Sequence, residues 1–162
     1  MKFFLTGRPR SGKTTLFLKI IKDLDIIPSG FYTEEIRKMG VRIGFRIRTF
    51  DGRQGILALT TRPTGYKVGK YYVDLDTFDR MAIPSLTVDS ELYAIDEIGK
   101  MEMLSDRFKK EINRLFNSDK HILATVGLAY RNILPDDGMV FMVTPARMEE
   151  IKGRILGFLK PR

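Results

Sequence analysis

The segment Gly7-Arg8-Pro9-Arg10-Ser11-Gly12-Lys13-Thr14 matches the pattern G-x-x-x-x-G-K-[ST]. Directly before it, residues 2–6 are a short, mainly apolar run that predicts a strand. Directly after it, apolar residues recur at helical spacing from Thr14 to Leu24. A strand, a glycine-rich loop and a helix, in this order, are the context that a phosphate-binding loop (P-loop) requires. A chance match to the pattern is therefore disfavoured.

The chemistry of such a loop follows from its backbone. Glycines let the chain curl so that successive N–H groups point at phosphate oxygens, and the positive end of the following helix adds to the attraction. We expect Lys13 to contact the β- and γ-phosphates of a nucleotide and the Thr14 hydroxyl to ligate Mg²⁺. Any magnesium would then arrive with the nucleotide.

A second motif, Tyr93-Ala94-Ile95-Asp96-Glu97, is an apolar strand that ends in two acids. In a P-loop protein the Asp at this position orients Mg²⁺, and a Glu directly after it polarises an attacking water. An ordinary exposed strand end is the alternative, but it is disfavoured beside a P-loop. We therefore predict Glu97 and Lys13 as catalytic residues, and Thr14 and Asp96 as magnesium ligands.

Two polar residues leave alternatives open. Thr125 lies at the end of the predicted strand at residues 122–126, where it senses the γ-phosphate or holds the attacking water, or is simply a good strand former. His121 is the single histidine, and we expect it to lie on the surface rather than to act in catalysis.

The net charge of +8 is concentrated in one part of the chain. Between residues 37 and 70 there are nine basic residues and one acidic residue, Asp51, so this segment carries the whole surplus. An anionic partner is the expected reason. Arg42, Arg46 and Arg48 share one face of a predicted strand, and any of them, or Arg8 or Arg10 in the loop, could act as an arginine finger. A solvated face and a nucleic-acid patch are the alternatives, but for the cluster as a whole we predict a phosphate-facing role.

The pattern along the chain predicts an α/β fold with parallel strands. The length of 162 residues favours one domain, residues 1–162, with a β-rich basic insertion at about residues 30–75. Within the insertion we expect a hairpin that turns at Met39-Gly40, and a second turn at Asp51-Gly52. The other expected strands are at 92–96, 122–126 and 139–143, and the other expected helices at 76–82 (ending before Pro84), 104–116 and 146–159.

The composition limits where the protein works. Its 43% hydrophobic and 30% charged residues are typical of a soluble globular protein. No apolar run approaches the roughly 20 residues needed to span a membrane, and the apolar start is too short for a signal peptide. The chain has no cysteine, which excludes disulfides and thiolate sites. We expect a cytoplasmic protein with no membrane contact.

Several blocks, in order, resemble the thermophilic nucleoside-triphosphatase family, whose vertebrate relative is called cancer-related nucleoside-triphosphatase. They are residues 7–15, GFYTEEIR at 30–37, RIGF at 42–45, VGKY at 68–71 and DEIGKME at 96–102. The match covers nearly all of residues 1–126. The P-loop is common to many enzymes, but the blocks GFYTEE and DEIGKME together are specific.

The resemblance implies a RecA-like P-loop NTPase fold, with a mostly parallel sheet flanked by helices and an inserted antiparallel segment. It also implies slow, Mg²⁺-dependent hydrolysis of several nucleoside triphosphates to diphosphate and phosphate. It assigns Glu97 as catalytic base and places Lys100 and Glu102 near the nucleotide. The expected nucleotide-binding residues are Gly7, Arg8, Pro9, Arg10, Ser11, Gly12, Lys13, Thr14, Thr15, Ile95, Asp96, Glu97, Ile98, Gly99 and Lys100.

The sequence departs from the family pattern in the P-loop and after Val126, where Gly127 stands at a position at which Pro or His is common. Arg10 stands where the loop of the family usually has Gly, so the loop geometry and its charge are expected to differ. Thr144-Pro145-Ala146-Arg147 only loosely resembles the family's Thr-x-x-Asn-Arg, so base recognition by Arg147 is not carried over.

Three functions are consistent with these residues. The first is hydrolysis of nucleoside triphosphates such as ATP and GTP by a monomer, which Glu97 favours. The second is a kinase that transfers the γ-phosphate to a nucleotide or to a nucleic-acid end. The third is a nucleotide switch that binds nucleic acid through the basic segment, although no RNA-recognition or zinc-finger pattern is present.

Overall fold

The computed structural model describes residues 1–160, which contain nine strands and four α-helices. The strands are β1 (Lys2–Thr6), β2 (Ser29–Lys38), β3 (Val41–Thr49), β4 (Gln54–Leu59), β5 (Lys67–Val68), β6 (Tyr71–Val73), β7 (Leu92–Ile98), β8 (His121–Val126) and β9 (Gly138–Met142). The helices are α1 (Lys13–Asp23), α2 (Leu75–Thr87), α3 (Asp106–Phe116) and α4 (Met148–Leu159). In the part of the chain that the structure describes, no helix is long and apolar enough to cross a membrane.

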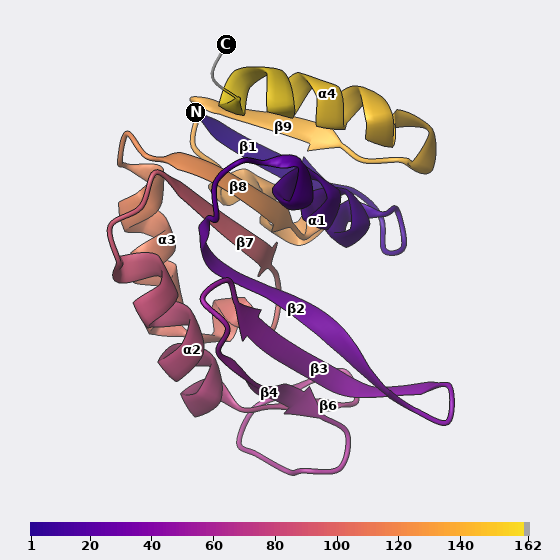
Figure 1. The fold of residues 1–162 in the computed structure, drawn as a ribbon. Coiled ribbons are helices and arrows are strands. Elements are labelled where there is room, and N and C mark those ends of the chain that lie inside the picture. The colour runs from indigo at the N-terminus through magenta and orange to yellow at the C-terminus, as the bar shows by residue number, and fades with distance from the viewer. Residues whose placement is uncertain (161–162) are drawn as a thin grey trace.

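All the strands belong to one sheet, in the order β5-β6-β4-β3-β2-β7-β8-β1-β9 (Figure 1). The five strands β2, β7, β8, β1 and β9 pair in parallel, each with its neighbour in this order. The strands β3, β4, β6 and β5 continue the sheet in antiparallel pairs. The predicted insertion is therefore the antiparallel half of the same sheet, joined to the parallel half through β2.

Helices cover both faces of the parallel half, as predicted for an α/β fold (Figure 1). On β1, Phe3 and Leu5 pack with buried residues of α1 and α4, while Phe4 packs on the opposite face with residues of α2 and α3. Strands β7 and β8 alternate in the same way. Strands that are buried on both faces need apolar residues at every position, which explains the continuous apolar runs in the sequence.

The predicted hairpin is confirmed as β2 and β3, which pair from Phe31 opposite Thr49 to Lys38 opposite Val41. Met39 and Gly40 form the turn with φ of 53° and 79°. Positive φ at both central residues is the requirement of the tight turn that matches strand twist. Strand β3, which follows this turn, pairs with β2 on one side and with β4 on the other.

The predicted end of the helix before Pro84 is wrong, because α2 continues through Pro84 to Thr87. Asp74 caps the helix by accepting a hydrogen bond from Thr77 N–H, which fixes where it begins. Pro84 has no N–H to donate to the preceding turn, but Ser85 and Leu86 beyond it are buried. Packing of this last turn against the sheet outweighs the missing hydrogen bond.

The helix predicted at residues 104–116 begins later, at Asp106. Ser105 lies at its N-cap and accepts a hydrogen bond from Phe108 N–H. The preceding residues Glu102–Leu104 form a short 3-10 helix instead. This short helix matters for the site, because it turns Glu102 inward.

Candidate active site

The P-loop connects the end of β1 to the start of α1, so the predicted strand, loop and helix are confirmed. Helix α1 begins at Lys13, directly after Gly12, whose φ is 98°. No acidic residue lies in the first turn of α1, so its N–H groups and positive dipole end remain available to an anion.

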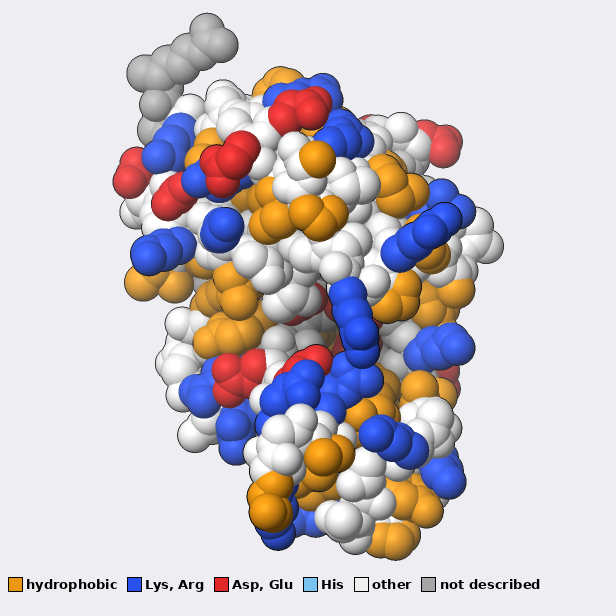
Figure 2. Space-filling view, turned by 90° about the vertical axis from the view of Figure 1, so that its right-hand side faces the viewer, with side chains coloured by type: hydrophobic (Ala, Val, Ile, Leu, Met, Phe, Trp, Pro, Cys, Tyr) orange, Lys and Arg blue, Asp and Glu red, His pale blue; other side chains and the backbone are white. Residues whose placement is uncertain are grey.

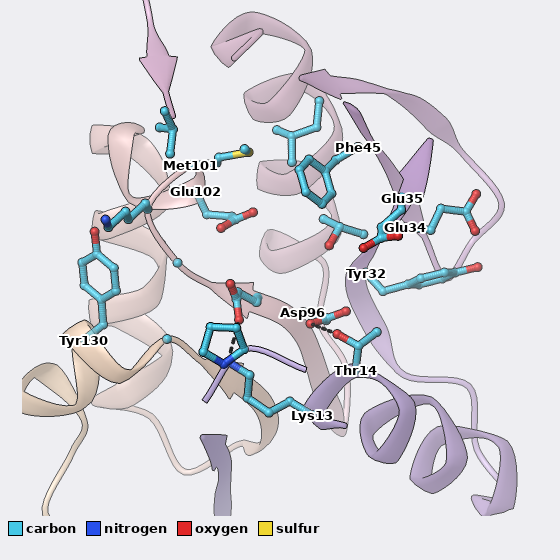
Figure 3. Close-up of a pocket in the computed structure, with 18 of the residues that line it drawn as sticks. Lys13, Thr14, Tyr32, Glu34, Glu35, Phe45, Asp96, Met101, Glu102 and Tyr130 are labelled. Carbon is cyan, nitrogen blue, oxygen red and sulfur yellow. Dashed lines mark hydrogen bonds and ion pairs between the residues drawn. The ribbon is translucent and has the colours of Figure 1, made fainter. Parts of the chain in front are cut away.

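The parallel strands bring the two motifs together. Strands β1, β7 and β8 all end at the edge of the sheet where the P-loop begins. There, Thr14 Oγ1 donates a hydrogen bond to Asp96 Oδ1 at 3.2 Å, and Lys13 Nζ lies 3.4 Å from Glu97 Oε2 (Figure 3). The four residues predicted for catalysis and magnesium binding therefore form one cluster.

A bulge in β7 lets both acids face this cluster. The pairing of β7 with β8 shifts between Ile95 and Ile98, so that β7 carries one extra residue here. In a regular strand, Asp96 and Glu97 would point to opposite faces of the sheet. Bulges change the direction of side chains beside active sites, and this one directs a pair of consecutive carboxylates toward the P-loop.

Thr125 lies in strand β8, and its hydroxyl contacts a carboxylate of the cluster. It is fully buried and donates a hydrogen bond to Asp96 Oδ1 at 2.6 Å. Thr14 donates to the same oxygen, so two hydroxyls orient the Asp96 carboxylate. The second oxygen, Asp96 Oδ2, is buried and has no hydrogen-bond partner within residues 1–160.

Burial also changes the acidity of two carboxyl groups in the site. Burial, with a smaller contribution from the neighbouring Glu97 carboxylate, raises the pKa of Asp96 to about 6, although the hydrogen bonds from Thr125 and Thr14 lower it. Burial raises the pKa of Glu102 to about 8, again with a contribution from Glu97. Glu102 is therefore mostly protonated at neutral pH, unlike an exposed glutamate.

Gly99 allows Glu97 and Glu102 to lie on the same side of the site. A Cβ atom at Gly99 would be only 2.7 Å from Glu97 Oε1 and 3.1 Å from Glu102 Oε1. Any side chain at this position would force one of the two carboxyl groups away. This is a physical reason for the glycine in the DEIGKME block.

The cluster lies in a cavity of about 780 Å³, which we call the central cavity. Figure 2 shows the molecule hollowed on this face, with acidic side chains inside the hollow and Lys and Arg side chains around it. Of the predicted nucleotide-binding residues, those that line the cavity are Gly7, Pro9, Lys13, Thr14, Asp96, Glu97, Gly99 and Lys100.

The other predicted binding residues lie outside the cavity lining. Arg8, Arg10 and Thr15 are exposed to solvent. Ile95 and Ile98 are buried in the hydrophobic core, so that only their backbone can contact a nucleotide.

The arginines of β3 are held by glutamates rather than left to face phosphate. Arg48 Nε donates to Glu34 Oε1 at 2.6 Å, and Arg46 lies 3.5 Å from the same oxygen. Arg42 donates to the Tyr71 hydroxyl at 2.7 Å and to Glu35 Oε1 at 3.1 Å. The predicted phosphate-facing role of this cluster therefore finds no support in these contacts.

The charge count missed this arrangement for a simple reason. Glu34 and Glu35 precede the basic segment in sequence, but the hairpin register places Glu34 directly opposite Arg46. Among the described residues, the basic side chains that line the central cavity are Lys13 and Lys100. A nucleic-acid partner for the basic segment stays a prediction.

The chain matches the family model described as NTPase over residues 2–156. The chain belongs to this family. A nucleoside-triphosphatase THEP1 from Thermotoga sp. (strain RQ2) is 40% identical over 168 aligned residues, which cover 99% of this chain and 96% of the relative. The THEP1 of Methanocaldococcus jannaschii is 36% identical, over 99% of this chain and 100% of the relative.

Two solved structures of the family share the fold. The crystal structure of THEP1 from the hyperthermophile Aquifex aeolicus superimposes with a TM-score of 0.89 at 31% identity, and covers 99% of this chain and 100% of that one. The solution structure of a human cancer-related nucleoside triphosphatase gives a TM-score of 0.79 at 33% identity, over 98% and 97% of the two chains. The resemblance inferred from the sequence blocks is confirmed, together with the α/β fold.

The P-loop conformation generates a first prediction, on stability. Arg10 has a φ of 65°, a left-handed conformation that costs a non-glycine residue about 1 kcal/mol. We predict that Arg10→Gly leaves the free energy of unfolding unchanged or raises it by up to about 1 kcal/mol. Arg8→Gly is the matched control, because Arg8 has a negative φ, and it should lower stability by roughly 0.5–1 kcal/mol. Equal losses in denaturant unfolding of both variants would contradict the prediction.

The buried carboxyl of Glu102 generates a second prediction, on pH dependence. Its pKa is raised from 4.5 to about 8, so within this window the folded protein holds a proton that the unfolded chain has released. The free energy of unfolding therefore falls as pH rises through the window. Glutamine does not titrate, so Glu102→Gln removes this pH-dependent loss of stability. The loss amounts to at most about 1.4 kcal/mol for each unit by which the pKa is raised.

Denaturant unfolding at pH 5 and pH 9 measures the effect. We expect Glu102→Gln to gain stability relative to the parent protein at pH 9, and to gain much less at pH 5. Glu91→Gln, which replaces an exposed glutamate, is the control and should follow the parent at both values. The same pH dependence in Glu102→Gln and the parent would show that Glu102 is not the group responsible.

Proposed function

We propose that the protein is a nucleoside-triphosphatase that hydrolyses several NTPs to the diphosphate and phosphate. The observation that carries the proposal is the pairing of Lys13 and Thr14 of the P-loop with Glu97 and Asp96 at one edge of the sheet. Membership of the NTPase family supports it. The relatives that are named nucleoside-triphosphatases cover nearly the whole chain.

We propose Mg²⁺ as the cofactor that enters with the nucleotide. Asp96 Oδ2 is buried with no hydrogen-bond partner in residues 1–160, and a cation would satisfy it. The Thr14 hydroxyl lies beside the same carboxylate. Mg²⁺ prefers oxygen ligands and is usually held by one or two protein groups together with phosphates, so Thr14 and Asp96 fit this ion. When bound, it would neutralise charge on the phosphate oxygens.

Glu97 is the proposed general base, and Lys13 controls when it is free. In the structure the Lys13 ammonium pairs with the Glu97 carboxylate. A P-loop lysine contacts the β- and γ-phosphates of its nucleotide, so a bound triphosphate competes with Glu97 for Lys13. Glu97, whose side chain is 36% exposed, is then able to accept a proton from water within hydrogen-bond reach. Binding of the nucleotide itself thus releases the base.

Lys100 is the proposed source of the extra positive charge that arginine fingers supply elsewhere. It lines the central cavity and follows Glu97 by three residues. The five arginines considered from the sequence do not belong to the cavity lining. A cation beside the γ-phosphate stabilises the charge of the transition state more than that of the bound substrate.

A phosphate-release assay with each of the common NTPs, with and without Mg²⁺, tests the function directly. We expect release with several bases and strong dependence on the metal. Absence of release under all conditions would overturn the proposal.

The role of Glu97 leads to a third prediction. Glu97→Gln should lower kcat by at least about 100-fold, because the amide cannot accept the proton. The Kd for the NTP should stay the same or fall, since the P-loop is untouched and Glu97 no longer competes for Lys13. Phosphate release and calorimetry measure the two quantities, with Glu91→Gln as control. Unchanged turnover would remove Glu97 from the mechanism.

The role of Lys100 leads to a fourth prediction. Lys100→Met keeps the length of the side chain and removes its charge, and should lower kcat about 10-fold or more with little effect on the Kd for the NTP. Lys110→Met, on the exposed side of α3, is the matched control and should keep the parent kcat. If both variants behave alike, the catalytic cation has to be sought elsewhere.

A further inference from the structure

The central cavity is longer than the cluster that would hold the phosphates. At one end lie Lys13, Thr14 and Asp96, and at the other end lie Phe45 and Met101 (Figure 3). Its volume of about 780 Å³ is in the range of complete small-molecule sites, about 300–1,000 Å³. The γ-phosphate and one water would occupy only the first end.

The extra space lies beyond the γ-phosphate and not on the side where the nucleobase of the NTP would lie. Lys13, Thr14 and Glu97, which would contact the γ-phosphate and its metal, line the cavity. Ser11, Gly12 and Thr15, which would surround the rest of the triphosphate, do not line it. A second molecule in this space would therefore face the γ-phosphate directly.

We call this far end the distal lobe. Its apolar residues, which belong to the cavity lining and to one hydrophobic cluster, are two aromatic rings and three aliphatic side chains, namely Phe45, Tyr130, Leu57, Val68 and Met101. The two rings come from separate elements, since Phe45 lies on β3 and Tyr130 in the segment after β8. Apolar walls that include aromatic rings are suited to a flat ring system.

The charged groups of the cavity limit the ligand further. Apart from the acid pair of β7, the carboxyl groups of the cavity lining are those of Glu34 and Glu35, which pair with arginines of β3, and that of Glu102, which is mostly protonated (Figure 3). The basic residues that line the cavity within residues 1–160 are Lys13 and Lys100, and both are assigned to the nucleotide phosphates. Within residues 1–160, a second anionic ligand would therefore meet no further basic residue of the lining, whereas an uncharged or cationic one meets hydrogen-bonding groups and aromatic rings.

We propose that the distal lobe binds a second substrate, an uncharged or cationic compound with an aromatic ring and a hydroxyl group, to which the γ-phosphate is transferred. This rests on the proposed function, because the same P-loop, Mg²⁺ and Glu97 are used. Water that occupies the position of the hydroxyl gives the hydrolysis described above.

The transfer step follows from the same geometry. The acceptor oxygen forms a bond to the γ-phosphorus, and the bond from that phosphorus to the β–γ bridging oxygen breaks. The electron pair leaves with the nucleoside diphosphate, and the hydroxyl proton passes to Glu97. The products are a phosphate monoester and the diphosphate, in line with an in-line phosphoryl transfer.

The test uses the whole protein with Mg²⁺ and γ-³²P-labelled ATP. One set of acceptors contains uncharged nucleosides and aromatic alcohols with and without an amine. The other set contains nucleoside monophosphates and an oligonucleotide with a 5′-hydroxyl. We expect label in an organic product with at least one member of the first set, and a matching decrease of free phosphate.

Variants connect the transfer to the distal lobe. Phe45→Ala and Tyr130→Ala each remove one ring, and should raise the KM for the acceptor at least about tenfold while the KM for ATP changes by less than about threefold. Two variants are needed because Phe45 also packs on Tyr71. Tyr66→Ala, which removes an exposed ring outside the lining, is the control.

Each outcome decides between the proposals. Release of free phosphate from ATP alone, with no labelled product from either set, would overturn the second-substrate site and leave the hydrolase intact. Label only in monophosphates or the oligonucleotide would overturn the ligand class. Parent KM values for the acceptor in both ring variants would place its site elsewhere, and no phosphate release at all would reject the proposed function itself.

Discussion

The active cluster depends on the parallel pairing of β1, β7 and β8. Thr6 lies opposite Val126 and Ile95 opposite Ala124, so the three strands end at the same edge. The P-loop leaves β1 there and α1 begins there, which places helix N–H groups beside the carboxylates of β7. Ligands of open α/β sheets bind at such edges. This register brings Lys13 and Glu97 into contact, although 84 positions separate them in the sequence.

The electrostatics of the site follow from burying carboxyl groups at that edge. Asp96 is buried and oriented by the hydroxyls of Thr14 and Thr125, and its other oxygen has no hydrogen-bond partner within residues 1–160. Glu102 is buried and retains its proton up to about pH 8. Buried charges and unsatisfied acceptors lower stability. The proposed Mg²⁺ would satisfy the free oxygen of Asp96 when the nucleotide binds.

The regular elements could be predicted because their signals are local. The alternation of apolar and polar residues in β3 and the helical spacing in α1 depend only on neighbours within a few positions. The prediction at α2 was wrong for the same reason. Pro84 signals a helix end locally, but the buried residues beyond it pack against the sheet and hold the last turn.

The P-loop and the acid pair, and with them the family, can be identified from the sequence, since each is a contiguous motif with its own chemistry, and together they predict the candidate site. The partner of each charged group depends on tertiary structure. Strand register sets Arg46 opposite Glu34, and packing buries Glu102 and directs Thr125 to Asp96. Such contacts join residues far apart in the chain, so their geometry and the shape of the cavity appear only when the sheet and helices are assembled.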